Sequence, residues 1–175
     1  MPAFDFQPTL SGERVTIRPI RPEDWDETFR VASDPLIWEV HPARDRYTEP
    51  AFRDFFDGAI ASGSAFAFID QATGAIIGSS RYHGYDSVSR EVEIGWTFLS
   101  RDYWGGSYNA EVKRLMLDHA FRFVDVVVFT VGLTNYRSQR AMEKIGGMRR
   151  EGTVSRVING AAVDHIIFEI RKPRA

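Results

Sequence analysis

The turn over residues 104–109 is the segment whose residue types and spacing point most directly to chemistry. Its sequence is Trp104-Gly105-Gly106-Ser107-Tyr108-Asn109, between a β-branched and aromatic run and a helical pattern. Backbone N–H groups in such a turn lack strand or helix partners and point toward the helix N-terminus. The arrangement suits an anion such as the pyrophosphate of a cofactor. The alternative is a plain tight turn in which Ser107 or Asn109 caps the helix.

Glu93 is a second candidate, because it stands in an otherwise apolar strand expected over residues 92–99. An unpaired charge in such surroundings is costly, so its presence needs a reason. One interpretation makes Glu93 a general base, either directly or through a water molecule. The other places it on the solvent face of an alternating strand, with Val92, Ile94 and Trp96 pointing the other way. The sequence leaves both open.

Composition predicts one soluble domain over residues 1–175. The chain is 43% hydrophobic and 26% charged, with a formal net charge of −2. Its basic residues cluster only mildly, at Arg149-Arg150 and 171–174, so we expect no nucleic-acid surface. Cysteine is absent, histidines lack metal-ligand spacing, and no signal-peptide pattern or membrane-length apolar run occurs. We therefore expect no metal and no membrane association, and a cytoplasmic location.

The elements that must position the turn and Glu93 follow the order β-α-α-β-β-β-α-β-α-β-β. Hydrophobic periodicity and turn residues indicate this order, with few ambiguous segments. The expected strands cover 14–18, 65–69, 75–82, 92–99, 124–131, 153–158 and 161–170, and the expected helices 21–34, 48–63, 107–123 and 135–145.

Three local signals set element ends. Asn135 is expected to cap its helix. Gly146-Gly147 is expected to end that helix as a left-handed pair, and Asn159-Gly160 to form a primed hairpin turn.

The order of elements and several segments resemble the GNAT superfamily of acyl-CoA-dependent N-acyltransferases. The likeness is greatest to its ribosomal-protein N-terminal acetyltransferase-like branch. The segments that carry it are Leu10–Asp24, Gly78–Tyr82, Val92–Trp96, Trp104–Lys113 and Thr134–Gly147. The resemblance implies a mixed α/β (α+β) fold, with a strongly twisted mixed sheet of about six to seven strands and about four flanking helices. The sheet should be splayed at the cofactor cleft.

The same resemblance implies an enzyme that transfers an acetyl group from acetyl-CoA to a primary amine. The acceptor would be a protein N-terminal α-amine or a small amino compound, and a homodimer is allowed. The alternative is a catalytically silent acyl-CoA-binding or interaction protein on the same fold. The implied cofactor-binding residues are Phe98, Leu99, Trp104, Gly105, Gly106, Ser107, Tyr108, Asn109, Asn135 and Ser138. Ser107 departs from the pattern, which has glycine at that position.

The resemblance also suggests catalytic and acceptor-side residues. Ser138 matches the position that protonates the leaving thiolate, and Glu93 remains the candidate base beside its solvent-face alternative. The acceptor-side candidates are Trp38, Tyr82, His83 and Trp96, although core packing is the simpler interpretation of Trp96. His83 is also a second candidate base. His41 and His165 could line this side, but ordinary loop and strand positions are expected for both.

Overall fold

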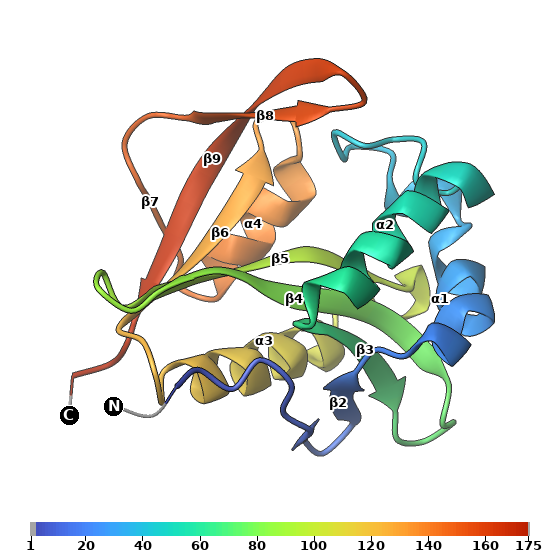
Figure 1. Ribbon diagram of the computed structural model, residues 1–175, viewed down its shortest axis with the longest axis horizontal. Coiled ribbons are helices and arrows are strands. Elements are labelled where there is room, and N and C mark those ends of the chain that lie inside the picture. Colours follow the sequence, from blue (N-terminus) through green and yellow to red (C-terminus); the bar gives the residue numbers. More distant parts are fainter. Residues whose placement is uncertain (1–2, 175) are drawn as a thin grey trace.

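The computed structural model describes residues 3–174, so residues 1, 2 and 175 of the predicted domain lie outside the described residues. It has a nine-stranded sheet with helices on both faces (Figure 1). The strands are β1 (Leu10–Ser11), β2 (Val15–Pro19), β3 (Ala65–Asp70), β4 (Ile76–Asp86), β5 (Glu91–Leu99), β6 (Val126–Gly132), β7 (Met148–Arg149), β8 (Val154–Ile158) and β9 (Ala161–Arg171). The helices are α1 (Trp25–Ala32), α2 (Glu49–Ser62), α3 (Ser107–Ala120) and α4 (Tyr136–Lys144), with short 3₁₀ turns at Pro22–Asp24, Pro35–Ile37 and Arg101–Tyr103.

The sheet has the order β1-β2-β3-β4-β5-β6-β9-β7, and β8 pairs with the remaining length of β9. It has more strands than expected because the two-residue strands β1 and β7 extend its edges. The expected mixed α/β GNAT-type fold is confirmed.

One parallel pair, β5 and β6, divides the sheet. The two strands pair only from Glu91 to Glu93, opposite Val126 to Val128. The other pairs in the described sheet are antiparallel. Beyond Glu93 the two strands have no ladder between them, so the expected splay is present at the middle of the sheet.

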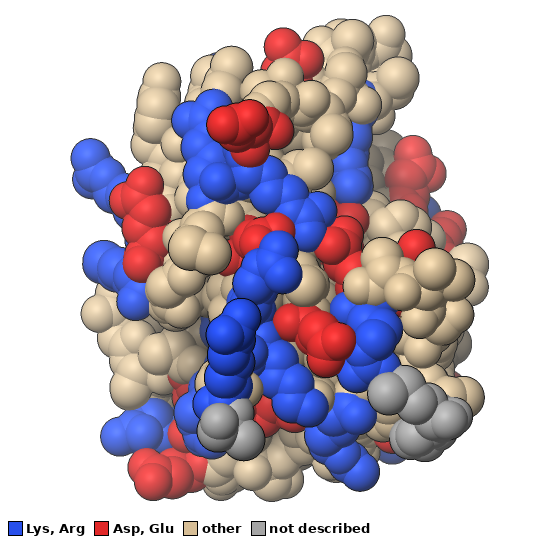
Figure 2. Space-filling model, turned by 90° about the vertical axis from the view of Figure 1, so that its left-hand side faces the viewer, with Lys and Arg blue, Asp and Glu red and all other residues tan. Residues whose placement is uncertain are grey.

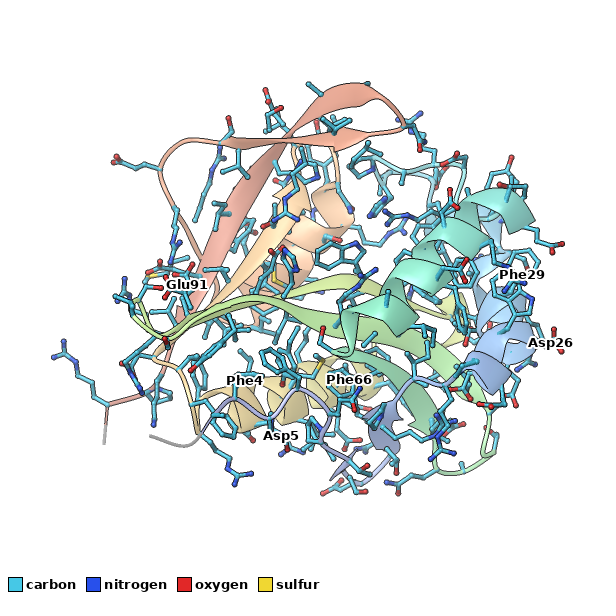
Figure 3. The ribbon with its side chains drawn as sticks, viewed as in Figure 1. Phe4, Asp5, Asp26, Phe29, Phe66 and Glu91 are labelled. Carbon is cyan, nitrogen blue, oxygen red and sulfur yellow. The ribbon has the colours of Figure 1, made fainter. Side chains whose placement is uncertain are left out.

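Two apolar clusters hold the helices on opposite faces. The larger cluster packs α3 and α4 on the sheet through residues such as Val112, Met116 and Met142. Phe4 and Phe66 also belong to it and lie between the sheet and α3 (Figure 3). The smaller cluster holds α1 and α2 on the other face, and its members include Trp38, Phe52, Phe55, Phe56 and Phe98. Burial of such aromatic side chains removes large apolar areas from water.

The ends of α3 and α4 follow the sequence signals with two differences. Helix α3 begins after Gly106, which is its N-cap, rather than after a capping Ser107 or Asn109. At the end of α4 only Gly146 adopts positive φ, at 85°. Gly147 is required for another reason, because a Cβ there would lie 2.9 Å from the Met142 carbonyl oxygen. The Asn159-Gly160 turn has positive φ at both residues, as a type I′ hairpin requires.

Charges of both signs alternate over the face that carries the C-terminal strand (Figure 2). Arg150 binds the carboxylates of both Glu91 and Glu169, and Arg171 also binds Glu169. Within residues 3–174, no helix is long and apolar enough to cross a membrane. The same residues contain no cluster of three or more histidine, cysteine or acidic side chains that could hold a metal ion.

Candidate active site

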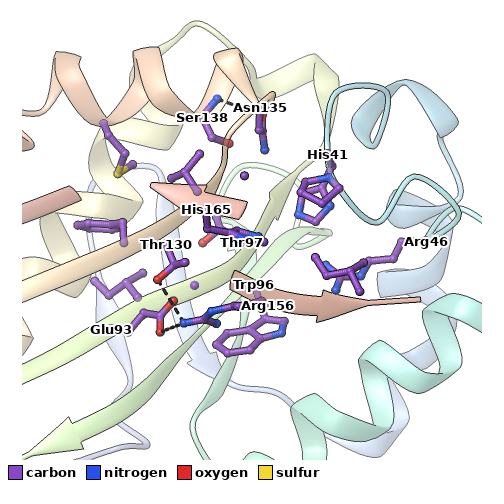
Figure 4. Close-up of a pocket in the computed structure, with 18 of the residues that line it drawn as sticks. His41, Arg46, Glu93, Trp96, Thr97, Thr130, Asn135, Ser138, Arg156 and His165 are labelled. Carbon is purple, nitrogen blue, oxygen red and sulfur yellow. Dashed lines mark hydrogen bonds and ion pairs between the residues drawn. The ribbon is translucent and has the colours of Figure 1, made fainter. Parts of the chain in front are cut away.

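A pocket of about 230 Å³ opens where β5 and β6 separate (Figure 4). Its walls come from the two splayed strands, helices α3 and α4, the β8–β9 hairpin and the loop between α1 and α2. The polar side chains among its lining residues are those of His41, Arg46, Glu93, Thr97, Lys113, Thr130, Asn135, Ser138, Arg156 and His165. The pocket therefore contains most of the titratable groups that the splayed sheet brings together.

Glu93 points into this pocket rather than to solvent. Its carboxylate is 7% exposed, and its Oε2 accepts a hydrogen bond of 2.9 Å from Arg156 Nη2. The same guanidinium nitrogen donates to Thr130 Oγ1 at 3.2 Å. Oε1 has no hydrogen-bond partner among the described residues. A Cβ at Gly95 would come within 3.3 Å of it, so glycine keeps space open beside this oxygen.

A bulge in β5 turns Trp96 to the same pocket as Glu93. Strand pairing shifts by one residue between Ser79 opposite Phe98 and Arg81 opposite Gly95. Trp96 lies in this interval with φ of 51°, an uncommon value for a bulky residue. The simple alternation that places Glu93 and Trp96 on opposite faces is therefore wrong. A bulge cannot be read from the period-2 pattern, because it is defined by the partner strand.

The turn before α3 keeps its backbone donors free of side-chain caps. Gly105 has φ of 69°, and Gly106 at the N-cap position makes no side-chain capping hydrogen bond to the N–H groups of the first turn. No acidic residue occurs in the first turn of α3. This local structure fits an anion, because the helix N-terminus carries unsatisfied N–H groups and a partial positive charge. Ser107 is exposed as the first helical residue, and its φ is not positive.

The turn lies outside the pocket lining but beside helix α4. The Arg137 guanidinium carbon lies 4.0 Å from the centre of the Trp104 ring. The indole nitrogen of Trp104 donates to the Leu99 carbonyl at 2.9 Å, so the turn is also tied to the end of β5. Tyr108, by contrast, uses its hydroxyl to bind Asp70 on β3 at 3.1 Å. Asn109 is half-buried in the first turn of α3.

Asn135 and Ser138 are brought together as expected. The Asn135 side chain accepts a hydrogen bond from the Ser138 backbone N–H at 3.3 Å and thereby caps α4. Both residues line the pocket, Asn135 from the connection that follows β6 and Ser138 from the first turn of α4. The Ser138 hydroxyl has no hydrogen bond within the described residues and is free to donate into the pocket.

The predicted aromatic acceptor wall is only partly present. Tyr82 is 1% exposed and its hydroxyl donates to the Met116 carbonyl at 2.6 Å, so it faces α3 in the core. Trp38 is also 1% exposed, and its indole nitrogen binds the Ala32 carbonyl. His83 is exposed and contacts Trp96 edge-on, with ring centres 5.0 Å apart. Trp96 alone of the four lines the pocket.

Two cofactor candidates on β5 also lie outside the pocket lining. Phe98 is buried in the smaller cluster, against Trp38 and Phe52. Leu99 is buried in the larger cluster, and its carbonyl accepts the bond from Trp104. Their side chains therefore belong to the apolar clusters and not to the pocket wall. Any contact that they make with a ligand would come from the backbone.

The two histidines in the pocket differ in their hydrogen bonds. His41 Nδ1 accepts the Ala43 backbone N–H at 2.9 Å. Burial, with the nearby charge of Arg46, lowers the His41 pKa to about 3. His41 is thus a neutral ring that carries its proton on Nε2. His165 donates from Nδ1 to the Val163 carbonyl at 2.9 Å, which leaves Nε2 as an acceptor.

Sequence analysis did not identify three cations of this site: Arg46, Lys113 and Arg156. Lys113 is 5% exposed, donates to Thr97 Oγ1 at 3.2 Å, and has a pKa lowered to about 8 by burial. Its position three residues before the buried Met116 is a signal that could have revealed it. Arg46 and Arg156 belong to a loop and a hairpin, and no local pattern places them at β5.

Comparisons with known proteins agree with this geometry. A model of the acetyltransferase (GNAT) domain matches residues 14–148. The uncharacterized N-acetyltransferase p20 of Bacillus licheniformis is 27% identical over 118 residues, which cover 65% of this chain and 66% of that protein. The chain thus aligns with slightly less than two thirds of the length of this curated relative.

Solved structures share the fold at lower identity. A GCN5-related N-acetyltransferase from Brucella melitensis has a TM-score of 0.84 and 22% identity, over 97% of this chain and 80% of that chain. RimJ from Mycobacterium smegmatis, solved in complex with CoA-disulfide, has a TM-score of 0.67 and 21% identity, over 94% of this chain and 88% of that chain. At these identities the two structures show a shared fold. Because the family model matches most of the chain, this protein belongs to the GNAT acetyltransferase family.

Proposed function

We propose that this protein transfers an acetyl group from acetyl-CoA to a primary amine. The observation that carries this proposal is that the Glu93 carboxylate and the Ser138 side chain border one pocket, at the point where β5 and β6 separate. An amine must lose a proton to attack a thioester, and the departing sulfur must gain one. The two residues could serve these two needs.

The chain's own residues fit acetyl-CoA in two places. The turn at Gly105 to Asn109 offers uncapped backbone donors for a pyrophosphate, and Arg137 on the neighbouring helix adds a positive charge. The gap between β5 and β6 leaves backbone groups of both strands without ladder partners there. An extended pantetheine chain with its own amide groups could use such partners.

Glu93 would accept the proton of the attacking amine through Oε1, directly or through water. Arg156 binds the other oxygen and holds the carboxylate in place. His165 Nε2 is a second acceptor in the same pocket and a rival for this task. A positioned base is typically worth roughly 10²–10⁴-fold in rate.

Ser138 would donate its hydroxyl proton to the sulfur as the C–S bond breaks. Bound acetyl-CoA would supply the activated acetyl thioester. The proton that the amine loses finally replaces the one that Ser138 gives to the sulfur, so that the products are the amide and the free thiol. His41, which carries its proton on Nε2, is a neutral donor on the wall of the same pocket. It could stabilise negative charge on the carbonyl oxygen.

The acceptor belongs to one of two classes, a protein N-terminal α-amine or a small amino compound. The structural likeness to RimJ favours neither by itself, because identity is low. A cytoplasmic location and a homodimer remain parts of the proposal that the fold does not decide.

The test combines two measurements on the full chain. Titration calorimetry measures acetyl-CoA binding, and release of free thiol is followed with a panel of peptides and small amines. We expect micromolar binding and acceptor-dependent thiol release. Binding without thiol release on any acceptor would favour the alternative, a catalytically silent acyl-CoA-binding protein.

A further inference from the structure

Two arginines from distant segments meet at one aromatic ring near the pocket. Arg46 comes from the loop before α2, and Arg81 comes from β4. Their guanidinium carbons lie 4.9 and 5.6 Å from the centre of the Phe55 ring. They are close enough for the charge of Arg46 to lower the pKa of Arg81.

Neither guanidinium has a carboxylate partner within residues 3–174. Arg81 is 9% exposed and donates from Nη1 to the Gly58 carbonyl at 3.2 Å, while its buried Nε has no partner. The half-buried Arg46 forms no side-chain hydrogen bond or ion pair in the described part of the chain. Burial lowers the pKa of each to about 10, so both remain charged at neutral pH. Asp45, the residue before Arg46 in the same loop, only partly offsets the lowering of the Arg46 pKa.

Such an arrangement is unfavourable for the fold alone. A buried charge without an opposite charge costs free energy, and two like charges near one ring add repulsion. Arg156, whose guanidinium carbon lies 5.9 Å from the centre of the Trp96 ring, differs in that it is paired with Glu93. A pair of unmatched cations therefore indicates a missing anion.

The position of the pair indicates where that anion would be carried. Arg46 lines the pocket with Glu93 and His41, and it points from its loop toward Trp96 (Figure 4). The Arg81 guanidinium carbon lies 4.3 Å from the centre of the Trp96 ring. Arg46 thus lines the pocket itself, while Arg81 is not a lining residue but contacts the lining residue Trp96 and shares the Phe55 ring with Arg46.

We propose that Arg46 and Arg81 form a subsite for a carboxylate carried by the amine acceptor. This inference rests on the proposed function and narrows its substrate class. The acceptor would hold an oxyanion close to its amine, as an amino acid does, or as a peptide does when an acidic side chain follows its N-terminal residue. Polycationic amines are excluded, because they would add to the unmatched positive charge.

The test uses the full chain saturated with CoA and pairs of ligands that differ only in one carboxylate. The peptide pair is Ser-Asp-Ala and Ser-Asn-Ala, both amidated at the C-terminus. The small-molecule pair is β-alanine and its amide. Calorimetry should show the charged member of one pair binding roughly ten- to a hundredfold more tightly. The pair that shows this preference identifies the source of the carboxylate.

Variants assign the preference to the two arginines. Arg46→Gln or Arg81→Gln should each remove most of it, while binding of the neutral member changes less than about threefold. Arg53→Gln is the matched control, because Arg53 also stacks on an aromatic ring, 3.2 Å from the centre of Trp25, but not on the Phe55 ring that Arg46 and Arg81 share. It should leave the preference intact.

Thermal unfolding adds a readout independent of activity. Arg46→Gln should keep or raise the melting temperature, since it removes an unmatched buried charge. Equal binding of both members in each pair, or a preference that survives both substitutions, would overturn the subsite. A clear preference without any thiol release would keep the subsite but contradict the proposed function.

Discussion

The two sides of the proposed site are built from different kinds of group. On the proposed cofactor side, the turn at Gly105 and Gly106, which lies outside the pocket lining, offers backbone N–H groups from one short segment. On the proposed acceptor side, Glu93, Arg156 and Arg46 are side chains from three segments that only the fold brings together. A site made of backbone groups is therefore local and tolerates changes of side chain, whereas a site made of side chains is distributed along the chain and depends on the identity of each residue.

The same contrast appears in the charges. The cofactor turn has no acidic residue in its helix turn and needs none, because its donors are peptide groups. The acceptor side holds one carboxylate among several cations, and only Arg156 is paired with it. Substitutions should therefore act through backbone conformation on one side and through charge on the other.

The largest effect is expected on the acceptor side. Glu93→Gln removes the proton acceptor and keeps the shape, so kcat/KM should fall roughly 10²–10⁴-fold. Steady-state kinetics with a saturating amine measures the loss.

Thr130→Val is the control for Glu93. It removes the hydroxyl that accepts from Arg156 but leaves the carboxylate, so the loss should stay below about tenfold. A Glu93→Gln protein that keeps most of its kcat/KM would mean that another group, with His165 first in line, is the base.

Substitutions in the turn before α3 should weaken acetyl-CoA binding by changing the backbone conformation of the turn. Gly105→Val places a β-branched residue at φ of 69°, a strained conformation that should change the backbone of the turn and displace its N–H groups, so acetyl-CoA affinity should fall at least about 100-fold. Gly106→Ala is the control, because its extended φ of −112° suits any residue and a Cβ there meets nothing within 4 Å. Its affinity should stay within about threefold in calorimetry. Tight binding by Gly105→Val contradicts the assignment of the turn.

Lys113 lines the pocket from α3, and its burial makes the stability of the fold depend on pH. Its pKa is lowered to about 8, so the unfolded chain binds more protons than the folded one above that pH. Stability should therefore rise with pH from about 8 toward 10.5, by about 1.4 kcal/mol per pH unit and about 3 kcal/mol in total. Lys113→Met should lack this rise and be more stable at pH 7 by about 2 kcal/mol. Urea unfolding at several pH values tests it, and parallel curves for both proteins refute it.

The smallest effect is expected for Ser138→Ala. The thiolate can also take its proton from water, so turnover should fall only about tenfold. Acetyl-CoA affinity should change less than about twofold, because α4 keeps its Asn135 cap. Ser89→Ala, on the exposed loop between β4 and β5, is the control. An equal loss of turnover and affinity would make Ser138 a binding residue.

The sequence predicted the local features of both sides and missed the distributed ones. Helix α4 with its Asn135 cap, and the glycine turn before α3, could be predicted because each signal lies within a few residues. Tyr82 was misplaced because strand alternation does not tell which face meets α3. Trp96 was rightly predicted near the pocket, but strand alternation alone put it on the face opposite Glu93, because the bulge depends on pairing with β4. Arg46 and Arg156 carry no local signal at all.

The central claim is tested most directly by a crystal structure of the full chain with CoA. We predict pyrophosphate oxygens within hydrogen-bond distance of backbone N–H groups between Gly105 and Asn109. The thiol should lie in the pocket between β5 and β6, near Ser138 and on the opposite side from Arg46. A CoA molecule bound elsewhere, with the turn free and the pocket vacant, would contradict the account.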